Sequence, residues 1–125
     1  MKSKYFILHF VLCASFFSQI AFAQTREDLQ KTQQFVNEGY VAAQRQDFLA
    51  AIESYTKAIN LYPKLAEIFF NRGTIYSFIR DYDLAIKDFD KAIELGKNLG
   101  EKQLSEFYMN RGLVFQTKGD YTKAV

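Results

Sequence analysis

Four aspartates that lie close together are the residues of this chain best placed for acid–base chemistry: Asp81, Asp83, Asp88 and Asp90. Two lysines, Lys87 and Lys91, are interleaved with them. Opposite charges three and four residues apart are typical of a solvent-exposed helix face, where they pair with one another. No nucleophile or positioned acid–base pair accompanies these carboxylates. The stretch therefore predicts a solvated face, and the chain is predicted not to be an enzyme.

The single histidine and the single cysteine both lie near the start of the chain, at His9 and Cys13. Residues 24–125 contain neither. This composition excludes Ser-His-Asp and Cys-His catalysis, zinc sites built from Cys and His, and disulfides in that segment. We therefore predict no catalytic residue, no metal site and no cofactor.

The net charge also limits the class of partner. The chain has 16 Lys and Arg against 14 Asp and Glu, and two of the basic residues are Lys2 and Lys4. Residues 24–125 are therefore neutral overall. Without a basic stripe, neither nucleic acid nor an anionic membrane surface is expected as the main partner.

The first 23 residues follow the plan of a secretory signal peptide. A positive start is followed by a mostly apolar run from Tyr5 to Phe17, and Ala21-Phe22-Ala23 supplies small residues around the expected cleavage point. An uncleaved membrane anchor is the alternative, but the run is shorter than the roughly 20 apolar residues of a spanning helix. Lipid attachment at Cys13 is disfavoured because Val11 and Leu12 precede it. We expect a periplasmic or secreted protein that starts near Gln24 and has no membrane contact after cleavage.

A repeat of 34 residues organises the remainder of the chain. Asn37 and Gly39 match Asn71 and Gly73, and Lys57-Ala58-Ile59 matches Lys91-Ala92-Ile93. A third copy follows five residues late, where Asn110-Arg111-Gly112 repeats Asn71-Arg72-Gly73. The extra residues fall around positions 96–100, and we expect them to lengthen the second helix of unit two or the loop after it. A tolerated surface insertion is the alternative.

Each unit is predicted to form two helices, because apolar residues recur at three- and four-residue spacing. Asp47, Asp81 and Asp120 are each expected to open a second helix. Three mid-helix glycines, Gly39, Gly73 and Gly112, share one register. Glycine costs about 1 kcal/mol in a helix, so the recurrence predicts a close approach of the partner helix. Small side chains on the partner helices are expected opposite these glycines, at Ala51, Ala58, Ala85, Ala92 and Ala124.

The spacing of large aromatics, Gly, Ala and Pro resembles the tetratricopeptide repeat family. Phe35, Gly39, Ala51, Tyr55, Ala58 and Pro63 carry the pattern in unit one, and Phe69, Gly73, Tyr76, Ala85, Phe89 and Ala92 carry it in unit two. The departures include Arg72 and Arg111, which stand where Leu is usual. The resemblance implies an all-α fold, an α-solenoid of antiparallel helix pairs with about two and a half repeats (32–65, 66–99 and a truncated 105–125). Unit three then exposes a face that includes Tyr108, Leu113 and Phe115.

The resemblance also implies a concave groove, lined by the first helix of each pair, that binds a protein or peptide segment. The expected groove residues are Val36, Asn37, Tyr40, Phe70, Asn71, Thr74, Met109 and Asn110. Asn37, Asn71 and Asn110 are expected to form a row of amides, and Val36, Phe70 and Met109 an apolar row beside it. Hydrogen bonding of these asparagines to their own helices is the alternative interpretation.

The groove is not expected to grip a C-terminal carboxylate. Family members that do so use Lys and Arg together with Asn. Here Val36, Tyr40, Glu106 and Asn110 stand at the positions of those partners, and Asn71 alone fits. The sequence therefore predicts a non-catalytic adaptor with a protein or peptide partner. The alternative is an assembly module, a piece of a longer repeat protein, that stacks or self-associates through an open C-terminal end.

Overall fold

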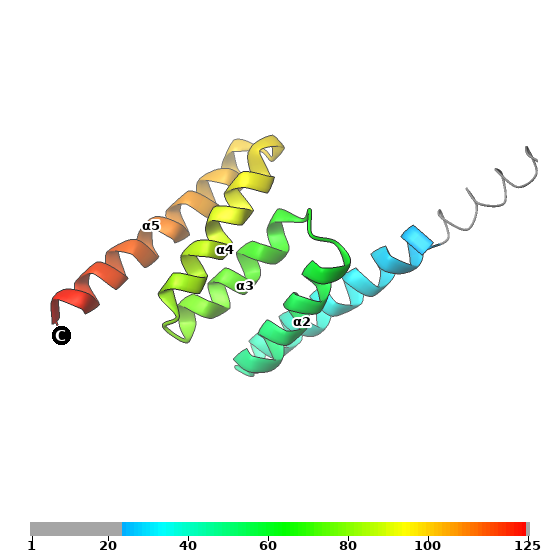
Figure 1. Cartoon of the computed structure of the whole chain (residues 1–125), viewed down its shortest axis with the longest axis horizontal. Helices are drawn as coiled ribbons and strands as arrows, with labels where there is room; N and C mark the ends of the chain where they lie inside the picture. Colours follow the sequence, from blue (N-terminus) through cyan, green and yellow to red (C-terminus); the bar gives the residue numbers. More distant parts are fainter. Residues whose placement is uncertain (1–23, 125) are drawn as a thin grey trace, which may run out of the picture.

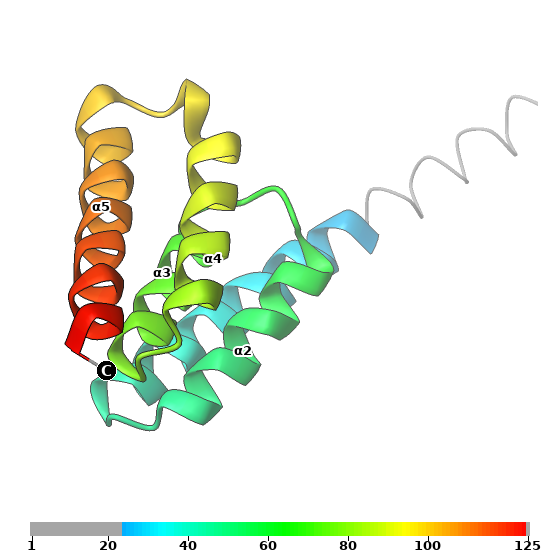
Figure 2. The same cartoon turned by 60° about the vertical axis from the view of Figure 1, so that its left-hand side comes forward.

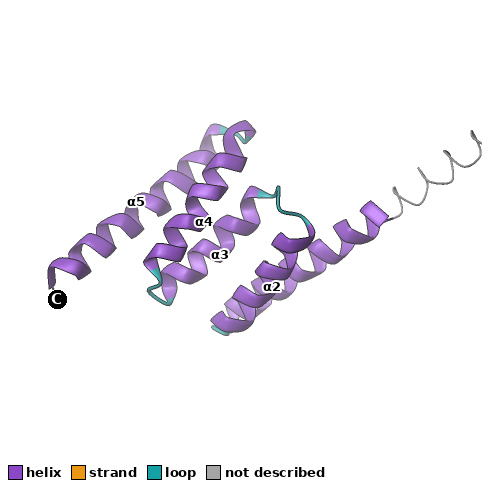
Figure 3. Ribbon diagram, in the orientation of Figure 1, coloured by secondary structure: helices purple, strands orange, loops and turns teal. Residues whose placement is uncertain are grey.

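The computed structural model describes residues 24–124, with side chains described as far as Gly119. The first helix covers residues 24–44 and is called the N-terminal helix here. It is followed by α2 (Phe48–Leu61), α3 (Ala66–Phe78), α4 (Tyr82–Leu95), a 3-10 turn η1 (Gly96–Asn98) and α5 (Glu101–Ala124). The described part of the chain contains no strand (Figure 3). This confirms the all-α prediction, while the expected signal peptide, residues 1–23, lies outside the described residues.

The helices form successive antiparallel pairs (Figure 1). The N-terminal helix pairs with α2, and α3 pairs with α4. α5 then lies along α4 on the side away from α2 (Figure 2). A hairpin of two helices cannot bury its apolar face alone, so stacking of one pair on the next completes the core.

Asp47 and Asp81 open α2 and α4, as predicted. The Asp47 carboxylate accepts a hydrogen bond from the backbone N–H of Ala50 at 3.2 Å, and Asp81 accepts one from Leu84 at 3.4 Å. Each aspartate follows a residue in the left-handed region, Gln46 with φ 60° and Arg80 with φ 65°. These paired features make the two sharp turns between the helices of units one and two.

The predicted helix start at Asp120 is wrong, because α5 continues through Gly119 and Asp120 to Ala124. None of the described glycines has a positive φ, so Gly119 does not adopt the left-handed turn that Gln46 and Arg80 adopt. Leaving a helix sacrifices backbone hydrogen bonds, and packing of the next helix has to compensate for them.

The five extra residues mostly lengthen α5 rather than α4. α4 ends at Leu95, which is the register position of Leu61 at the end of α2. The connection that follows covers 96–100, against 62–65 in unit one. α5 then begins nine residues before Asn110, whereas α3 begins five before Asn71. The expectation of a longer second helix is therefore wrong, and the one-residue longer loop accounts for only part of the insertion.

The small residues of the repeat lie in the core, as predicted for units one and two. Ala51, Ala58, Ala85 and Ala92 are fully buried. A methyl group added to Gly39 would lie 2.8 Å from the Tyr55 ring, and one added to Gly73 would lie 3.1 Å from Phe89 and 3.2 Å from the Ala85 carbonyl oxygen. Gly112 has no such neighbour within 4 Å. The close approach is thus confirmed for Gly39 and Gly73 and is wrong for Gly112.

Candidate functional site

A hollow of about 570 Å³ lies between the first helices of units one and two. We call it the groove hollow. The residues that line it are Tyr40, Ala43, Gln44, Gln46, Phe48, Tyr55, Asn71, Thr74, Ile75 and Phe78. Three of the predicted groove residues, Tyr40, Asn71 and Thr74, are therefore brought together here. Aromatic rings and uncharged amides dominate this lining.

Two phenylalanines outside the eight expected groove residues form one wall of the groove hollow. Phe48 is the first residue of α2 and Phe78 the last residue of α3. Their rings stack with centroids 5.9 Å apart and an interplanar angle of 3°. Phe78 is nevertheless 67% exposed and Tyr40 is 60% exposed. The hollow thus offers large apolar surface to an incoming side chain.

The three predicted asparagines differ in the hydrogen bonds of their amides. Asn37 accepts from Gln33 Nε2 at 3.0 Å, and Asn110 donates to the Glu106 carbonyl at 2.9 Å. The structure records no hydrogen bond from the Asn71 amide to any other described residue. Asn71 is therefore the one that can give both its donor and its acceptor to a ligand.

The other predicted groove residues lie elsewhere. Asn37 lines a separate hollow of about 780 Å³ on the N-terminal helix and α2, beside Glu38, Arg45 and Asp47. Val36 packs against the larger core cluster. Phe70 stacks on Phe107 of α5 at 4.7 Å between ring centroids and lies 5.6 Å from Phe89. Met109 is exposed on α5.

Thr74 uses its hydroxyl locally, because Oγ1 donates to the Phe70 carbonyl of its own helix at 2.9 Å. In the lining of the groove hollow, Thr74 therefore offers its methyl group and a hydroxyl oxygen that can accept a hydrogen bond. Its hydroxyl proton is already donated within α3.

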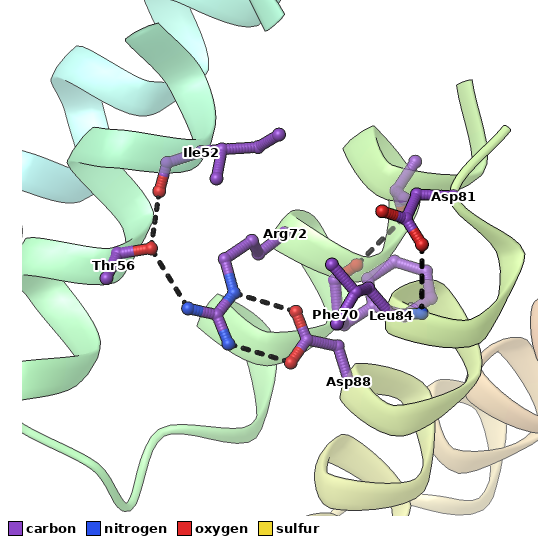
Figure 4. Close-up of polar contacts among 8 residues, drawn as sticks. Ile52, Thr56, Phe70, Arg72, Asp81, Leu84 and Asp88 are labelled. Carbon is purple, nitrogen blue, oxygen red and sulfur yellow. Dashed lines mark hydrogen bonds and ion pairs between the residues drawn. The ribbon is translucent and has the colours of Figure 1, made fainter. Parts of the chain in front are cut away.

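A largely buried polar network joins α2, α3 and α4 (Figure 4). Arg72 of α3 donates from Nε to Asp88 Oδ2 at 2.7 Å and from Nη2 to Asp88 Oδ1 at 2.8 Å. It also donates from Nη1 to Thr56 Oγ1 of α2 at 3.0 Å. The hydrogen bond to Asp88 raises the pKa of Arg72, so the guanidinium stays charged.

This network corrects the prediction of a solvated aspartate face. Asp88 is only 4% exposed. It lies three residues after Ala85 and four before Ala92, which places all three side chains on the face that meets α3. Asp90 and Asp83 do reach the surface, but their partners are Arg111 and Lys118 of α5 rather than Lys87. The sequence signal that could have placed Asp88 in the core is therefore its helical spacing from the two buried alanines.

Within residues 24–124, no helix combines the length and the apolar character that are needed to cross a membrane. Among the same residues, no three His, Cys, Asp or Glu side chains gather closely enough to hold a metal ion.

The sequence matches known families over most of this architecture. Residues 66–99 match the family described as tetratricopeptide repeat, and residues 39–77 match the family described as TPR repeat. The small glutamine-rich tetratricopeptide repeat-containing protein 2 of Mycosarcoma maydis is 36% identical over 99 residues, which cover 79% of this chain and 27% of that protein. The chain thus spans about a quarter of the length of the curated relative that it matches.

Solved structures share the fold. The second TPR domain of Spaghetti (RPAP3), bound to the HSP90 peptide SRMEEVD, superposes with a TM-score of 0.67 at 25% identity and covers 80% of this chain and 87% of that one. The TPR2B domain of yeast Sti1 in its pHsp70 complex gives a TM-score of 0.65 at 24% identity and covers 76% and 72%.

These matches and the stacked helical hairpins define the class of protein. The chain contains tetratricopeptide repeats and folds as a short α-solenoid. Repeats of this family and fold are typically non-catalytic interaction modules.

Proposed function

We propose that this chain is a non-catalytic adaptor that binds a protein or peptide segment in the groove hollow. The observation that carries the proposal is the free amide of Asn71 between the exposed rings of Tyr40 and Phe78. An amide without an internal partner can pair with the backbone of an extended peptide. Exposed aromatic rings supply the apolar contact area that dominates many interfaces.

The chemistry of the lining favours an uncharged segment with an aromatic or large aliphatic side chain. Tyr40, Phe48, Tyr55 and Phe78 can surround such a side chain, while Gln44 and Asn71 can contact its backbone. The likeness to a domain that holds an HSP90 peptide supports a peptide partner in general. It does not extend to the acidic C-terminus of that peptide, because Tyr40 and Asn110 replace two of the clamp partners here.

The test begins with heptapeptides selected on the wild-type chain from a random display library. Their affinity is then measured by fluorescence anisotropy for Asn71→Ala and Tyr40→Ala. Each change is expected to weaken binding at least about tenfold, since each removes a contact worth roughly 1.4 kcal/mol or more. Asn37→Ala and Asn110→Ala are the matched controls, because both amides bond to their own helix. Full binding by Asn71→Ala and Tyr40→Ala would place the peptide elsewhere and refute the proposal.

The location of this adaptor is a separate proposal. Export through the signal peptide of residues 1–23 is supported by the sequence pattern alone. Expression of the full chain in a bacterial host, followed by N-terminal sequencing of the periplasmic fraction, is expected to show a new terminus at Gln24. A full-length protein that keeps Met1 in the cytoplasmic fraction would contradict it.

A further inference from the structure

The Tyr55 hydroxyl is a polar group for which the chain itself supplies no partner. Tyr55 is 2% exposed, and no described residue forms a hydrogen bond with its hydroxyl. In the described part of the chain, every fully enclosed side-chain nitrogen or oxygen has a partner. The Tyr55 hydroxyl oxygen therefore reaches open space, and the groove hollow is the space that Tyr55 lines. A nearly buried hydroxyl without a partner is destabilising, and a hydrogen bond to a ligand would remove that cost.

Tyr55 reaches the groove hollow past a glycine. It belongs to α2, the second helix of its pair, whereas the hollow lies between the first helices of units one and two. A methyl group added to Gly39 would lie 2.8 Å from Tyr55 Cε1 and 3.0 Å from Cζ, the carbon that bears the hydroxyl. The far end of the ring therefore lies against the N-terminal helix at Gly39. The bare glycine backbone leaves room for the hydroxyl on the groove side.

Unit two shows that packing does not require this hydroxyl. Phe89 is the register equivalent of Tyr55 and is 1% exposed. A methyl group added to Gly73 would lie 3.1 Å from Phe89 Cε1, the same ring atom that meets Gly39 in unit one. The two rings thus fill the same place in their units, and only unit one adds a hydroxyl. Its use is therefore expected in the groove hollow rather than in the core.

The rest of the lining indicates which kind of side chain would meet the Tyr55 hydroxyl. None of the described residues that line the groove hollow is charged, and an unpaired charge is costly away from water. The entering group is therefore neutral. Tyr40, Phe48 and Phe78 offer aromatic surface, which favours an aromatic ring. Burial, with a smaller contribution from Tyr40, raises the pKa of Tyr55, so its hydroxyl keeps the proton that it can donate.

We propose that the groove hollow is a pocket for a tyrosine side chain of the bound segment, with Tyr55 as its specificity-determining residue. The ligand ring lies among Tyr40, Phe48 and Phe78, and the ligand hydroxyl accepts a hydrogen bond from Tyr55. The Asn71 amide remains for the backbone of the segment. A phenylalanine would fill the same space but leave the Tyr55 hydroxyl unpaired. This inference rests on the proposed function and adds the residue that the partner carries.

The first experiment carries out the display selection on the wild-type chain and on Tyr55→Phe. Heptapeptides that bind the wild type are expected to share a tyrosine, and those that bind Tyr55→Phe are expected to carry phenylalanine or leucine at that position. The variant is expected to fold as the wild type at neutral pH, because Phe89 packs in the same way in unit two. Circular dichroism and the urea midpoint check this. Tyr62→Phe, just after α2 and outside the lining, is the matched control and is expected to select tyrosine.

A double-mutant cycle then measures the contact between the two hydroxyls. A selected heptapeptide, and the same peptide with phenylalanine in place of its tyrosine, are titrated against both chains by fluorescence anisotropy. The wild type is expected to bind the tyrosine peptide at least about fivefold more tightly, because the phenylalanine peptide leaves a hydroxyl unpaired. With Tyr55→Phe this preference is expected to disappear. The phosphotyrosine version is expected to lose binding to both chains, because the lining has no cation for its charge.

The outcomes separate this inference from the proposed function. Selected peptides that share no tyrosine, or a tyrosine preference that is equal in Tyr55→Phe and the wild type, would overturn the tyrosine pocket. Losses of affinity with Asn71→Ala and Tyr40→Ala would in that case still place the peptide in the groove hollow. Peptides that bind all three variants as tightly as the wild type would overturn both. A tyrosine preference that Tyr55→Phe abolishes and Tyr62→Phe keeps supports the inference.

Discussion

Replacing Arg72 by Leu should destabilise the protein strongly, although leucine is the usual residue of the family at that position. The change leaves the Asp88 carboxylate, 4% exposed, without either of its two charged hydrogen bonds. Removing one partner of a buried ion pair typically costs about 3–5 kcal/mol. A domain of this size is stable by about 5–15 kcal/mol. The loss therefore corresponds to a fall in unfolding temperature of roughly 12–40 °C.

The double variant Arg72→Leu/Asp88→Leu distinguishes the unpaired charge from a simple packing defect. Replacing both partners of a buried pair by apolar residues is often close to neutral. Thr56 keeps a hydrogen bond in this variant, because its hydroxyl also donates to the Ile52 carbonyl at 2.7 Å. The double variant is thus expected to recover at least about 2 kcal/mol relative to the sum of the two single changes.

Urea unfolding, followed by circular dichroism at neutral pH, measures each free energy. Arg111→Leu is the matched control, because it breaks the partly exposed pair with Asp90 and should cost less than about 1 kcal/mol. A cost below about 1 kcal/mol for Arg72→Leu, or strictly additive effects in the double variant, would show that the Arg72–Asp88 pair does not contribute as its burial indicates.

Three smaller predictions follow from single positions. Gly39→Ala should destabilise the protein by up to about 2 kcal/mol in urea unfolding, because the new methyl would lie 2.8 Å from the buried Tyr55 ring. Gly112→Ala should stabilise it by up to about 1 kcal/mol, because nothing lies within 4 Å of the new methyl. Equal effects of the two changes would contradict the close approach at Gly39. Asp47→Ala should cost about 1 kcal/mol through loss of the helix cap in the same assay, and no loss would contradict the capping role. Burial, with a smaller contribution from Tyr40, raises the pKa of Tyr55 above its ordinary value of 10.0. The contribution of the protonated Tyr55 hydroxyl to the free energy of unfolding is complete below about pH 10 and is lost as the pH rises through the folded-state pKa. Tyr55→Phe should therefore flatten the fall of the urea midpoint in that pH range. An unchanged slope would contradict the assignment to Tyr55.

The helix pairs could be predicted from the sequence because their signals are local and occur twice. The carboxylates of Asp47 and Asp81 each accept a hydrogen bond from the backbone N–H three residues later, at the start of a helix. Ala58 and Ala92 are buried in the same register. A pattern within one helix needs no knowledge of its neighbour, and the second copy of the pattern supports the first.

The contents of the groove were less predictable because they depend on contacts between helices. The row predicted for Val36, Phe70 and Met109 assumes that every first helix presents the same face. Phe107 of α5, at the register position of the buried Ile68, stacks on Phe70, so the Phe70 ring packs inward. Phe48 and Phe78 meet only because a turn in unit one and the end of α3 in unit two lie next to each other. Such pairs depend on the stacking geometry, which periodicity alone does not specify.

The stability of the Arg72 network and the affinity of the groove hollow should be linked through α3. Arg72 anchors α3 to α2 by Thr56 and to α4 by Asp88, and the adjacent residue, Asn71, lines the groove hollow. A contact that must be placed within a fraction of an ångström loses strength when its supporting residues move. Arg72→Leu should therefore weaken the selected heptapeptides even at temperatures where the variant is fully folded, whereas Arg111→Leu should not. Equal affinity of the folded Arg72→Leu variant and the wild type would mean that the groove keeps its shape without the network.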